Sequence, residues 1–288
     1  MTFRTLVLSG VAAVAFAGVA HAGNGNYASI EQVGTPSAPP AVNYPNGTAA
    51  GTIATIDQTG NSNSATSYQR ARIGAVVGAV DIDQVGNSNS AKVDQIGRFS
   101  GSTVNQSGNA NYGQTNQTGA SAIAAIGQTG NTNYGRVTQY ASSSLGLVSQ
   151  TGNTNYADTL QGGANFAQAY TTQAGNNNGA TIKQGVGTDT AGSFAAVTQT
   201  GNSNWGTVDQ LGTTNNGTII SSGSSNGATV SQTGLTNIGA VAQAGNSNWA
   251  SVMQAGDANL GAISQVGNAN VGAISTTGSG TIALINQN

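Results

Sequence analysis

The side chains that most often perform chemistry in proteins are scarce in this sequence. Of its 288 residues only 6% are charged, there is no Cys, and the one His is His21, close to the N-terminus. Asp81 and Asp83 have the spacing of two carboxylates on one face of a strand, but no catalytic side chain of another type accompanies them. We therefore interpret them as a solvated pair that limits uncontrolled aggregation.

Motifs for phosphate, calcium and nucleic acid are incomplete. Gly185, Val186 and Gly187 are not followed by the Gly-Lys-Ser/Thr of a phosphate-binding loop, and Asp257 lacks the Gly-Gly-x-Gly-x-Asp context of calcium-binding repeats. The few Lys and Arg residues form no basic stripe in a chain of formal net charge -2. We expect no enzymatic activity, no catalytic residue, no cofactor, no metal and no nucleic-acid partner.

The first residues predict export. Arg4 supplies a positive charge, an apolar run follows from Leu6 to Val19, and Ala20-His21-Ala22 is typical of a signal-peptidase site. The apolar run is about fourteen residues long, shorter than the ~20 that span a bilayer. The sequence predicts a secretory signal peptide over 1–22, cleaved near Ala22, and a mature chain that starts at Gly23 without His and without a membrane span.

Glutamine is the one side chain that recurs at a fixed spacing. From Gln84 to Gln161 it appears every eleven residues without interruption, and the lattice extends in both directions with few local insertions. Ser221 and Thr276 occupy the two lattice points that lack Gln. The lattice, which we predict to be a structural ladder, consists of Gln58, Gln69, Gln84, Gln95, Gln106, Gln117, Gln128, Gln139, Gln150, Gln161, Gln173, Gln184, Gln199, Gln210, Gln232, Gln243, Gln254, Gln265 and Gln287.

The residues around each lattice Gln indicate a strand followed by a turn. The pattern [Ala/Gly]-x-[Val/Ile]-x-Gln alternates with a period of two and is rich in β-branched residues, as expected of a strand with one buried face. After the Gln the chain often reads Gln-x-Gly-x-x-Asn, and Gly and Asn suit a tight turn. The predicted turn residues are Gly60, Asn63, Gly86, Asn89, Gly108, Asn111, Gly130, Asn133, Gly152 and Asn155.

Strong and weak turns alternate up to Gln184, so the true repeat is about 22 residues, with two strands in each. In an ordinary hairpin the two strands of one repeat pair with each other, and this arrangement does not bring equivalent Gln residues of successive repeats together. Stacked β-arches instead pair each strand in parallel with its equivalent about 4.8 Å away, so buried Gln amides hydrogen-bond along the stack and avoid a cost of ~1–3 kcal/mol each. The sequence predicts an all-β, amyloid-like β-solenoid with two parallel sheets and ten to eleven rungs over residues 52–288.

The repeated motif resembles the curlin repeat of curli fibre subunits. Gln-x-Gly-x-x-Asn-x-Ala-x-x-x-Gln occurs literally at 58–69 and 84–95, and it recurs with Gly in place of Ala at Gln106 and Gln128. The resemblance covers about residues 52–288. It implies a secreted bacterial structural subunit that self-assembles into extracellular amyloid fibres for biofilm matrix, adhesion and surface colonisation. It also implies a nucleator subunit and an outer-membrane curli-type secretion pore as partners.

This chain departs from the family in its larger number of rungs and in its N-terminal region, residues 23–51. That region begins with a short Gly/Asn stretch resembling an export-targeting segment, and Gln32 is placed as the lattice residue of an incomplete first rung. A loop follows that holds all four Pro residues of the chain: Pro36, Pro39, Pro40 and Pro45. Because Pro cannot donate to a strand ladder, this loop either caps that end against pairing or serves as a simple linker.

The C-terminal segment differs from the Pro-rich N-terminal region, because it finishes on a complete strand without charge or Pro. An uncapped strand edge is a template for another chain. We therefore predict a polymerisation edge at Ile282, Leu284 and Ile285, with further copies of the same chain as the partner.

Aromatic residues follow the turn Asn in several repeats, and the sequence leaves two interpretations of them open. Tyr112, Tyr134, Tyr156, Trp205 and Trp249 either stack along the rod for structural reasons or form a carbohydrate-binding strip. The alternative to a fibre subunit is a monomeric β-solenoid that acts as an adhesin or as a surface-, carbohydrate- or ice-binding module. The solvent-facing positions are too varied for the regular Thr ladder of an ice-binding protein.

Overall fold

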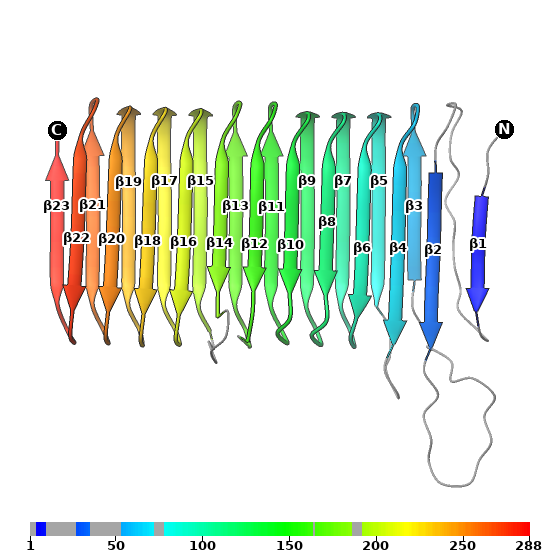
Figure 1. The fold of residues 1–288 in the computed structure, drawn as a ribbon, viewed down its shortest axis with the longest axis horizontal. Helices are drawn as coiled ribbons and strands as arrows, with labels where there is room; N and C mark the ends of the chain where they lie inside the picture. The colour runs from blue at the N-terminus through cyan, green and yellow to red at the C-terminus, as the bar shows by residue number, and fades with distance from the viewer. Residues whose placement is uncertain (1–3, 10–26, 35–52, 72–77, 164, 186–191) are drawn as a thin grey trace, which may run out of the picture.

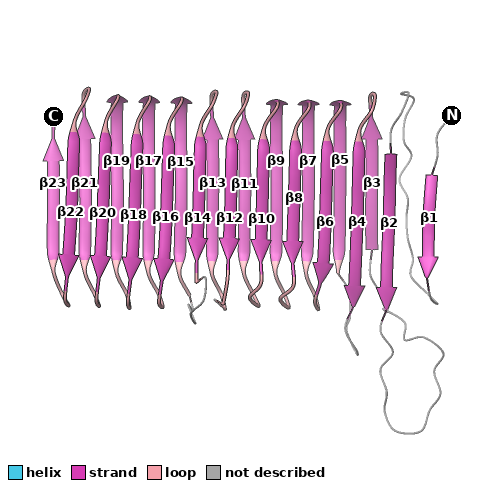
Figure 2. Ribbon diagram, viewed as in Figure 1, coloured by secondary structure: helices cyan, strands magenta, loops and turns pink. Residues whose placement is uncertain are grey.

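The strands of the protein stack side by side into one long rod, with the two chain ends at opposite ends of it (Figure 1). Our computed structural model describes residues 4–9, 27–34, 53–71, 78–163, 165–185 and 192–288. Every regular element in these parts is a β-strand, and none of them contains a helix able to cross a membrane (Figure 2).

The strands form two sheets, which we call sheet A and sheet B. Sheet A has 12 strands in the order β1 (Arg4–Ser9), β2 (Tyr27–Gly34), β4 (Ser64–Ala71), β6 (Ser90–Ile96), β8 (Tyr112–Gln117), β10 (Tyr134–Gln139), β12 (Tyr156–Gln161), β14 (Gly179–Gln184), β16 (Trp205–Leu211), β18 (Gly227–Thr233), β20 (Trp249–Ala255) and β22 (Val271–Thr277). Sheet B has 11 strands in the order β3 (Ile53–Thr59), β5 (Ala79–Asn87), β7 (Gly101–Asn109), β9 (Ile123–Asn131), β11 (Leu145–Thr151), β13 (Gln168–Ala174), β15 (Phe194–Asn202), β17 (Asn216–Ser224), β19 (Ile238–Asn246), β21 (Leu260–Val266) and β23 (Ile282–Gln287).

Neighbouring strands within each sheet are parallel and lie in register, repeat on repeat. Gln128 of β9 aligns with Gln150 of β11, and Tyr134 of β10 aligns with Tyr156 of β12. One sheet B strand, a turn and one sheet A strand make a rung; β3 with β4 is the first complete rung and β21 with β22 the tenth, while β23 begins an eleventh. The predicted all-β solenoid with two parallel sheets is confirmed.

The narrow space between the sheets holds three columns of side chains from each sheet. Ala or Gly, then Val or Ile, then Gln face inward along each strand, and these residues are buried. A Cβ atom placed on Gly113 of sheet A would lie 2.7 Å from Cγ1 of Val104 in sheet B. The small residues of one sheet therefore lie opposite the branched residues of the other, and this keeps the two sheets close.

The apolar core is divided into two clusters near its middle. One cluster ends at Ala157 and the other begins at Ala169. Between them Thr159 and Thr171 occupy positions where most rungs have Val or Ile, and their buried hydroxyl groups lack a hydrogen-bond partner. Each such group costs about 1–3 kcal/mol, so these two hydroxyl groups lower the stability of the stack where their rungs meet.

Insertions in the repeat fall at one kind of junction only. The three places where the Gln spacing lengthens lie between β4 and β5, between β12 and β13, and between β14 and β15. Each of these links leads from a sheet A strand to the next sheet B strand. The opposite turns, from sheet B to sheet A, keep one length throughout the described rungs because their side chains are hydrogen-bonded from rung to rung.

The N-terminal strands extend sheet A beyond the first complete rung. β2 pairs in parallel with β4 and aligns Gln32 with Gln69, which is the arrangement expected of an incomplete rung. β1 lies inside the segment predicted to be a signal peptide and pairs with β2. The predictions for Gly23 to Asn26, for Pro36 to Pro45 and for Val186 and Gly187 concern positions outside the described residues.

The turn from sheet B to sheet A generates a prediction, because it leaves no room for a side chain on its glycine. Gly130 has a φ of +116°, and an added Cβ would lie 2.0 Å from the carbonyl oxygen of Gly152. We expect Gly130→Ala to lower the free energy of unfolding by at least ~2 kcal/mol, since the left-handed backbone alone costs an L-residue about 1–2 kcal/mol. Urea unfolding followed by circular dichroism measures the change.

Gly127 of the same strand is the matched control. It has no positive φ, and an added Cβ would meet nothing within 4 Å. Gly127→Ala should leave stability unchanged or raise it by about 0.4–1 kcal/mol through a less flexible unfolded chain. Equal losses in the two variants would contradict our account of the turn.

Candidate functional site: amide ladders and open strand edges

The lattice Gln side chains form two continuous ladders inside the rod, one in each sheet. Nε2 of Gln106 donates to Oε1 of Gln128 at 2.8 Å, and Nε2 of Gln128 donates to Oε1 of Gln150 at 2.8 Å. In sheet A, Nε2 of Gln117 donates to Oε1 of Gln139 at 2.9 Å. Both ladders have the same polarity, because every such amide donates toward the C-terminal end of the rod.

The second amide hydrogen of each Gln is used across the core. Nε2 of Gln128, in sheet B, also donates to the carbonyl oxygen of Tyr112 in sheet A at 2.9 Å. Each ladder thus joins neighbouring rungs and also ties the two sheets to each other. All the predicted lattice Gln residues from Gln58 to Gln265 are buried, whereas Gln287 is half-buried because no rung follows it.

Ser221 and Thr276 interrupt the ladders, as their position on the lattice indicates. Ser221 is too short to reach both neighbours, and its hydroxyl donates to Oε1 of Gln243 at 3.0 Å. Thr276 instead donates to the carbonyl oxygen of Met253 at 3.5 Å. The sheet B ladder therefore has a gap between Gln199 and Gln243, two rungs apart.

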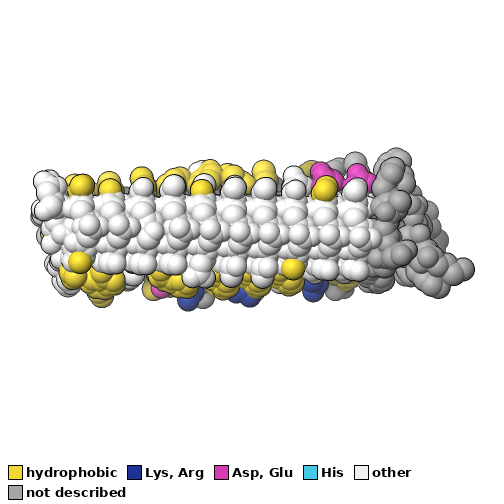
Figure 3. Space-filling view, turned by 90° about the horizontal axis from the view of Figure 1, so that it is seen from above, with side chains coloured by type: hydrophobic (Ala, Val, Ile, Leu, Met, Phe, Trp, Pro, Cys, Tyr) yellow, Lys and Arg dark blue, Asp and Glu magenta, His cyan; other side chains and the backbone are white. Residues whose placement is uncertain are grey.

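The predicted turn residues form a further ladder along the edge of the rod. The backbone N–H of Asn133 donates to Oδ1 of Asn111 at 3.0 Å, and Nδ2 of Asn133 donates to the carbonyl oxygen of Gly152 at 2.8 Å. All five predicted glycines have a positive φ, and all five predicted asparagines are buried. Figure 3 views this turn edge, where polar side chains and backbone form straight rows.

Two features of the turn escaped the sequence-based prediction. The Asn that directly follows the turn glycine makes its own exposed ladder, in which Nδ2 of Asn109 donates to Oδ1 of Asn131 at 3.0 Å. The next residue adopts a left-handed backbone although it is not Gly, as at Ala110 and Thr132 with φ of 55° and 58°. The repeated Gly-Asn-x-Asn motif indicates the exposed Asn ladder. The residue type at position x varies, so it does not indicate the left-handed backbone there.

The three predicted tyrosines lie stacked on the outer face of sheet A. The ring centroids of Tyr112 and Tyr134 are 5.0 Å apart, as are those of Tyr134 and Tyr156. Both faces of Tyr134 are covered by its two neighbours, so the stack presents mainly ring edges along the rod instead of a row of open ring faces. Trp205 lies against Gly179 of the preceding rung, and Gly227 separates it from Trp249.

The charged side chains of sheet A include one ion pair between neighbouring rungs. Arg136 and Asp158 are register partners, and Nε of Arg136 donates to Oδ1 of Asp158 at 2.9 Å while its Nη2 donates to Oδ2. The hydrogen bond to Asp158 raises the pKa of Arg136 above its ordinary value. The contact of Lys92 with Asp94 at 3.0 Å is more exposed and contributes little to stability.

The predicted carboxylate pair lies on the outer face of sheet B, beside a third carboxylate. Asp57 and Asp83 are register partners on adjacent strands, and Asp81 lies two residues before Asp83. Partial burial raises the pKa of Asp83, and the charges of Asp81 and Asp57 raise it further. No group of metal-ligating side chains occurs in the part of the chain that the structure describes.

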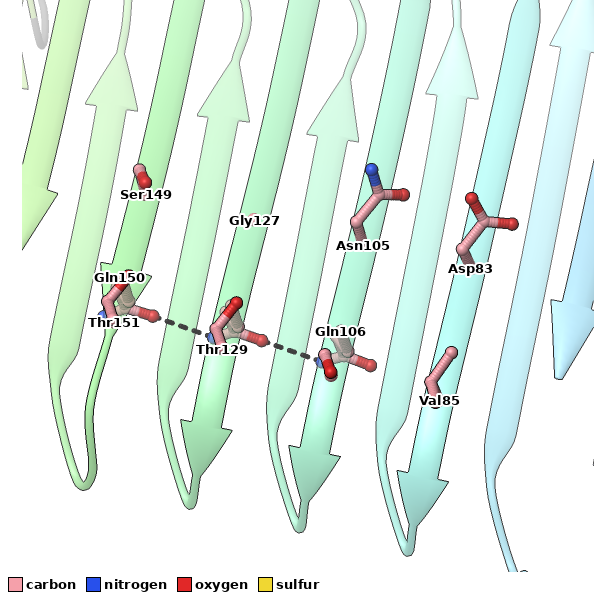
Figure 4. Close-up of a pocket in the computed structure, with 11 residues that line it drawn as sticks. Asp83, Val85, Asn105, Gln106, Gly127, Thr129, Ser149, Gln150 and Thr151 are labelled. Carbon is pink, nitrogen blue, oxygen red and sulfur yellow. Dashed lines mark hydrogen bonds between the residues drawn. The ribbon is translucent and has the colours of Figure 1, made fainter. Parts of the chain in front are cut away.

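A shallow groove of about 360 Å³ lies nearby on the same face. Gly127 forms its floor because it has no side chain, and Asn105 and Ser149 on the adjacent strands flank it (Figure 4). Asp83 is the one charged residue in its lining, and no side chain of another catalytic type joins it. The groove is therefore a gap in a column of outer side chains.

The residues predicted to form a polymerisation edge lie on the C-terminal strand, β23. The N–H of Leu260 donates to the carbonyl oxygen of Thr281, and alternate residues of a parallel strand point the same way. By the same register, the N–H groups of Ile282 and Leu284 point away from β21, toward the open edge. Their side chains are 70% and 68% exposed, whereas Ile285 faces inward and packs against the core.

These features define a β-solenoid held by amide ladders, and comparison with known proteins agrees. A family model for the curlin associated repeat matches residues 79–108, which cover β5 to β7, and residues 201–234, which cover β16 to β18. The chain therefore contains curlin-type repeats in these two stretches. No curated protein matches the chain.

The ladder can be tested by exchanging its regular and interrupted positions. Gln128→Ser should lower the free energy of unfolding by about 2–4 kcal/mol, because it leaves the amides of Gln106 and Gln150 without their partner and opens a cavity. Ser221→Gln should raise it by about 1 kcal/mol by closing the gap between Gln199 and Gln243. Urea unfolding of both variants measures the effects. If the ladder did not contribute to stability, the free energy of unfolding would change only slightly in both variants, and in the same direction.

The cluster of Asp57, Asp81 and Asp83 predicts that the stability of the fold depends on pH. A carboxyl group whose pKa is higher in the folded than in the unfolded chain binds more protons when folded, so stability falls as pH rises from the ordinary value of 3.8 through the raised value. The wild-type chain should therefore be more stable just below this window than above it. Asp83→Asn should raise the unfolding midpoint at pH 7 and flatten this dependence.

Asp209→Asn on the opposite sheet removes the same formal charge and serves as the control. Thermal unfolding of both variants between pH 3 and pH 7 separates the local effect from that of net charge. If both variants flattened the profile equally, the Asp57, Asp81 and Asp83 cluster would not be its cause.

Proposed function

We propose that this chain is a secreted structural subunit that self-assembles end to end into extracellular, curli-like amyloid fibres. One observation carries the proposal: the in-register strands and the amide ladder of sheet B continue to β23, which leaves donors exposed at Ile282 and Leu284. Another copy of the chain offers the same strand spacing and side-chain columns, so it extends both sheets without a change of structure.

The curlin repeat supports a wider setting for this fibre. Members of the curlin family are structural fibre subunits, so we propose roles in biofilm matrix, adhesion and surface colonisation, with no enzymatic activity. A nucleator subunit and an outer-membrane curli-type secretion pore are the proposed partners. The signal-like sequence over residues 1–22 supports export and an extracellular location at the bacterial surface.

A monomeric binding module is less well supported. Such a solenoid needs capped ends to remain monomeric, and the C-terminal edge has no covering segment among the described residues. The outer column of sheet B reads Asp83, Asn105, Gly127 and Ser149 on successive strands, which is no regular ligand-binding surface. In the tyrosine stack both faces of Tyr134 are covered by its neighbours, so the stack does not form a row of open ring faces.

Fibre formation by the mature chain is the first test. Protein that starts at Gly23, incubated at neutral pH, should increase thioflavin fluorescence and form fibres visible by electron microscopy. Aligned fibres should diffract at about 4.8 Å along the fibre and about 10 Å across it. A chain that stays monomeric for days, even when seeded with its own aggregates, would overturn the fibre proposal.

The growing edge can be tested with a single proline. Leu284→Pro removes a donor that points to the open edge and spares the bonds between β21 and β23, so the rod should fold while elongation on seeds slows at least tenfold. Leu284→Ala keeps the donor and should slow growth far less. Val42→Pro, in the Pro-rich region, is the control for an added proline. Equal growth of Leu284→Pro and wild type would place the growing edge elsewhere.

A further inference from the structure

The outer faces of the two sheets differ in charge. In the strands of sheet B from β7 to β23 no residue is charged, and its three carboxylates, Asp57, Asp81 and Asp83, lie together on β3 and β5. Figure 3 shows Lys and Arg side chains on one long side of the rod only. The strands of sheet A from β6 to β16 carry Lys92, Asp94, Arg136, Asp158, Lys183 and Asp209.

The outer face of sheet B has two open positions and two projecting side chains. Gly101 and Gly127 are the only glycines in the outer columns of its strands, and an added Cβ on either would meet nothing within 4 Å. Gly127 forms the floor of the groove of about 360 Å³. Ile220 and Ile238, in the other half of the face, are each about half exposed. One uncharged face thus offers both the holes and the knobs of a packed contact.

One two-fold axis relates these holes to these knobs. In sheet B, β9 and β17 lie two strands on either side of β13, and β7 and β19 lie three strands on either side of it. Gly127 of β9 and Ile220 of β17 share one column, which passes through Thr172 of β13. Gly101 of β7 and Ile238 of β19 share another column. A two-fold axis parallel to β13, midway between two facing copies, therefore brings each Ile over a Gly of the other copy.

We propose that the outer face of sheet B is an interface with a second copy of this chain, which packs on it around this axis with its rod reversed. Ile220 of each copy enters the groove over Gly127 of the other, and Ile238 lies over Gly101. Packed sheets lie about 10 Å apart with their side chains interdigitated. The contact goes beyond the proposed fibre and does not require it, because single rods pair in the same way as rods within fibres.

Other outer side chains agree with the same axis. Val85 of β5 and Val266 of β21 both directly follow a lattice Gln and lie four strands on either side of β13, so the two exposed valines meet across the interface. Leu147 of β11 and Ala196 of β15 share a column and lie one strand on either side of β13. A large residue therefore faces a small one there as well.

Tyr170 lies on the axis and leaves room for this packing. Its ring centroid is 5.5 Å from that of Phe194 on β15, and its hydroxyl donates to Oε1 of Gln168 at 3.4 Å. The ring therefore leans toward β15. In the second copy, whose rod is reversed, the equivalent ring leans the opposite way, so the two rings diverge at the axis.

The acidic cluster favours the reversed direction. Two rods that pointed the same way would place Asp81 and Asp83 of one copy opposite the same residues of the other, and like charges that face each other across an interface oppose binding. With the rods reversed, Asp83 faces Ser264 of the other copy and Asp81 faces Ala262. Neither position opposite the acidic pair is charged.

The face is large enough for a stable contact. From β5 to β21 it comprises nine strands. At about 4.8 Å per strand and roughly 20 Å of strand length, each copy contributes roughly 850 Å². The sum for two copies, roughly 1,700 Å², lies within the ~1,200–2,000 Å² of specific, stable interfaces.

Chemical cross-linking can detect the pairing, because the chain has no Cys of its own. Asn105 of β7 and Ala242 of β19 are exposed in the column of Gly127, and the axis places each over the other across about 10 Å. Two copies of Asn105 are then offset by six strands, about 29 Å. Copies stacked end to end keep Ala242 at least five strands, about 24 Å, from Asn105 of the next copy.

The experiment mixes full chains that each carry one cysteine and treats them with a bismaleimide that spans about 10 Å. Asn105→Cys with Ala242→Cys should give at least tenfold more cross-linked dimer than Asn105→Cys alone or than Ser231→Cys, which lies on sheet A. A larger yield from Asn105→Cys alone would show rods packed in the same direction. Yields no higher than that of Ser231→Cys would show that the face does not pair. Either result overturns the inference and leaves the fibre proposal standing, whereas failure to form fibres leaves the cross-linking of single rods as the test.

The knob and the hole can also be exchanged in this cross-linking pair. Gly127→Ile fills the groove without a clash in its own chain and should lower the dimer yield at least fivefold. Gly127→Ile combined with Ile220→Gly exchanges the two partners and should restore the yield to within about twofold. Ser231→Ile adds the same side chain to sheet A and should leave the yield unchanged, while circular dichroism checks the fold of each variant. An undiminished yield with Gly127→Ile, or no recovery in the exchange, would overturn the proposed packing.

Discussion

The structure depends on one constraint, the need of a buried amide for partners on both sides. A Gln side chain inside this narrow core must donate two hydrogen bonds and accept at least one, and each unmet bond costs about 1–3 kcal/mol. The only neighbours that offer a matching group at the strand spacing are other Gln residues in the same position, as at Gln106, Gln128 and Gln150. Register follows from this, because a slip of one residue would move every Gln to the outer face. Parallel stacking follows in turn, and so does the constant spacing of eleven residues across each turn from sheet B to sheet A.

The same constraint explains where the rod tolerates change. The turns from sheet B to sheet A carry the Asn ladders, and their length is fixed because an extra residue would break bonds to two neighbouring rungs. The opposite links carry fewer such bonds before Asn215, and all three insertions fall in that part of the chain. Inside the core, the rod accepts Ser221, Thr159 and Thr171 because each rung contacts only its neighbours, so a local loss is not spread through the whole molecule.

The ladders and the fold could be predicted from the sequence because period, strand pattern and turn chemistry all indicate the same 22-residue unit. The buried state of Gln58 to Gln265 and the positive φ of Gly60 and Gly86 need no information beyond that unit. The left-handed residue between the two turn asparagines could not be predicted, since Ala110 and Thr132 have no local preference for it and are held there by the ladders on both sides. Arg136 and Asp158 each lie three residues before a lattice Gln, so the 22-residue register already makes them neighbours, whereas the two hydrogen bonds of their ion pair depend on side-chain conformations that the register does not specify.

Within such a rod, the contacts between one molecule and the next would differ little from the contacts between neighbouring rungs of one molecule. Each interior rung is held to its neighbour by backbone bonds, two Gln amides and the turn asparagines, and only the link after each sheet A strand adds a covalent connection. At the C-terminal end the sheet B Gln and the backbone groups are present in the same positions, with Ile282 and Leu284 directed outward, whereas Thr276 replaces the sheet A Gln. A protein that must stay monomeric protects such an edge with charge, proline or a covering segment. Among the described residues none of these protects β23, so the interactions that stabilise the fold are also those that would recruit the next copy.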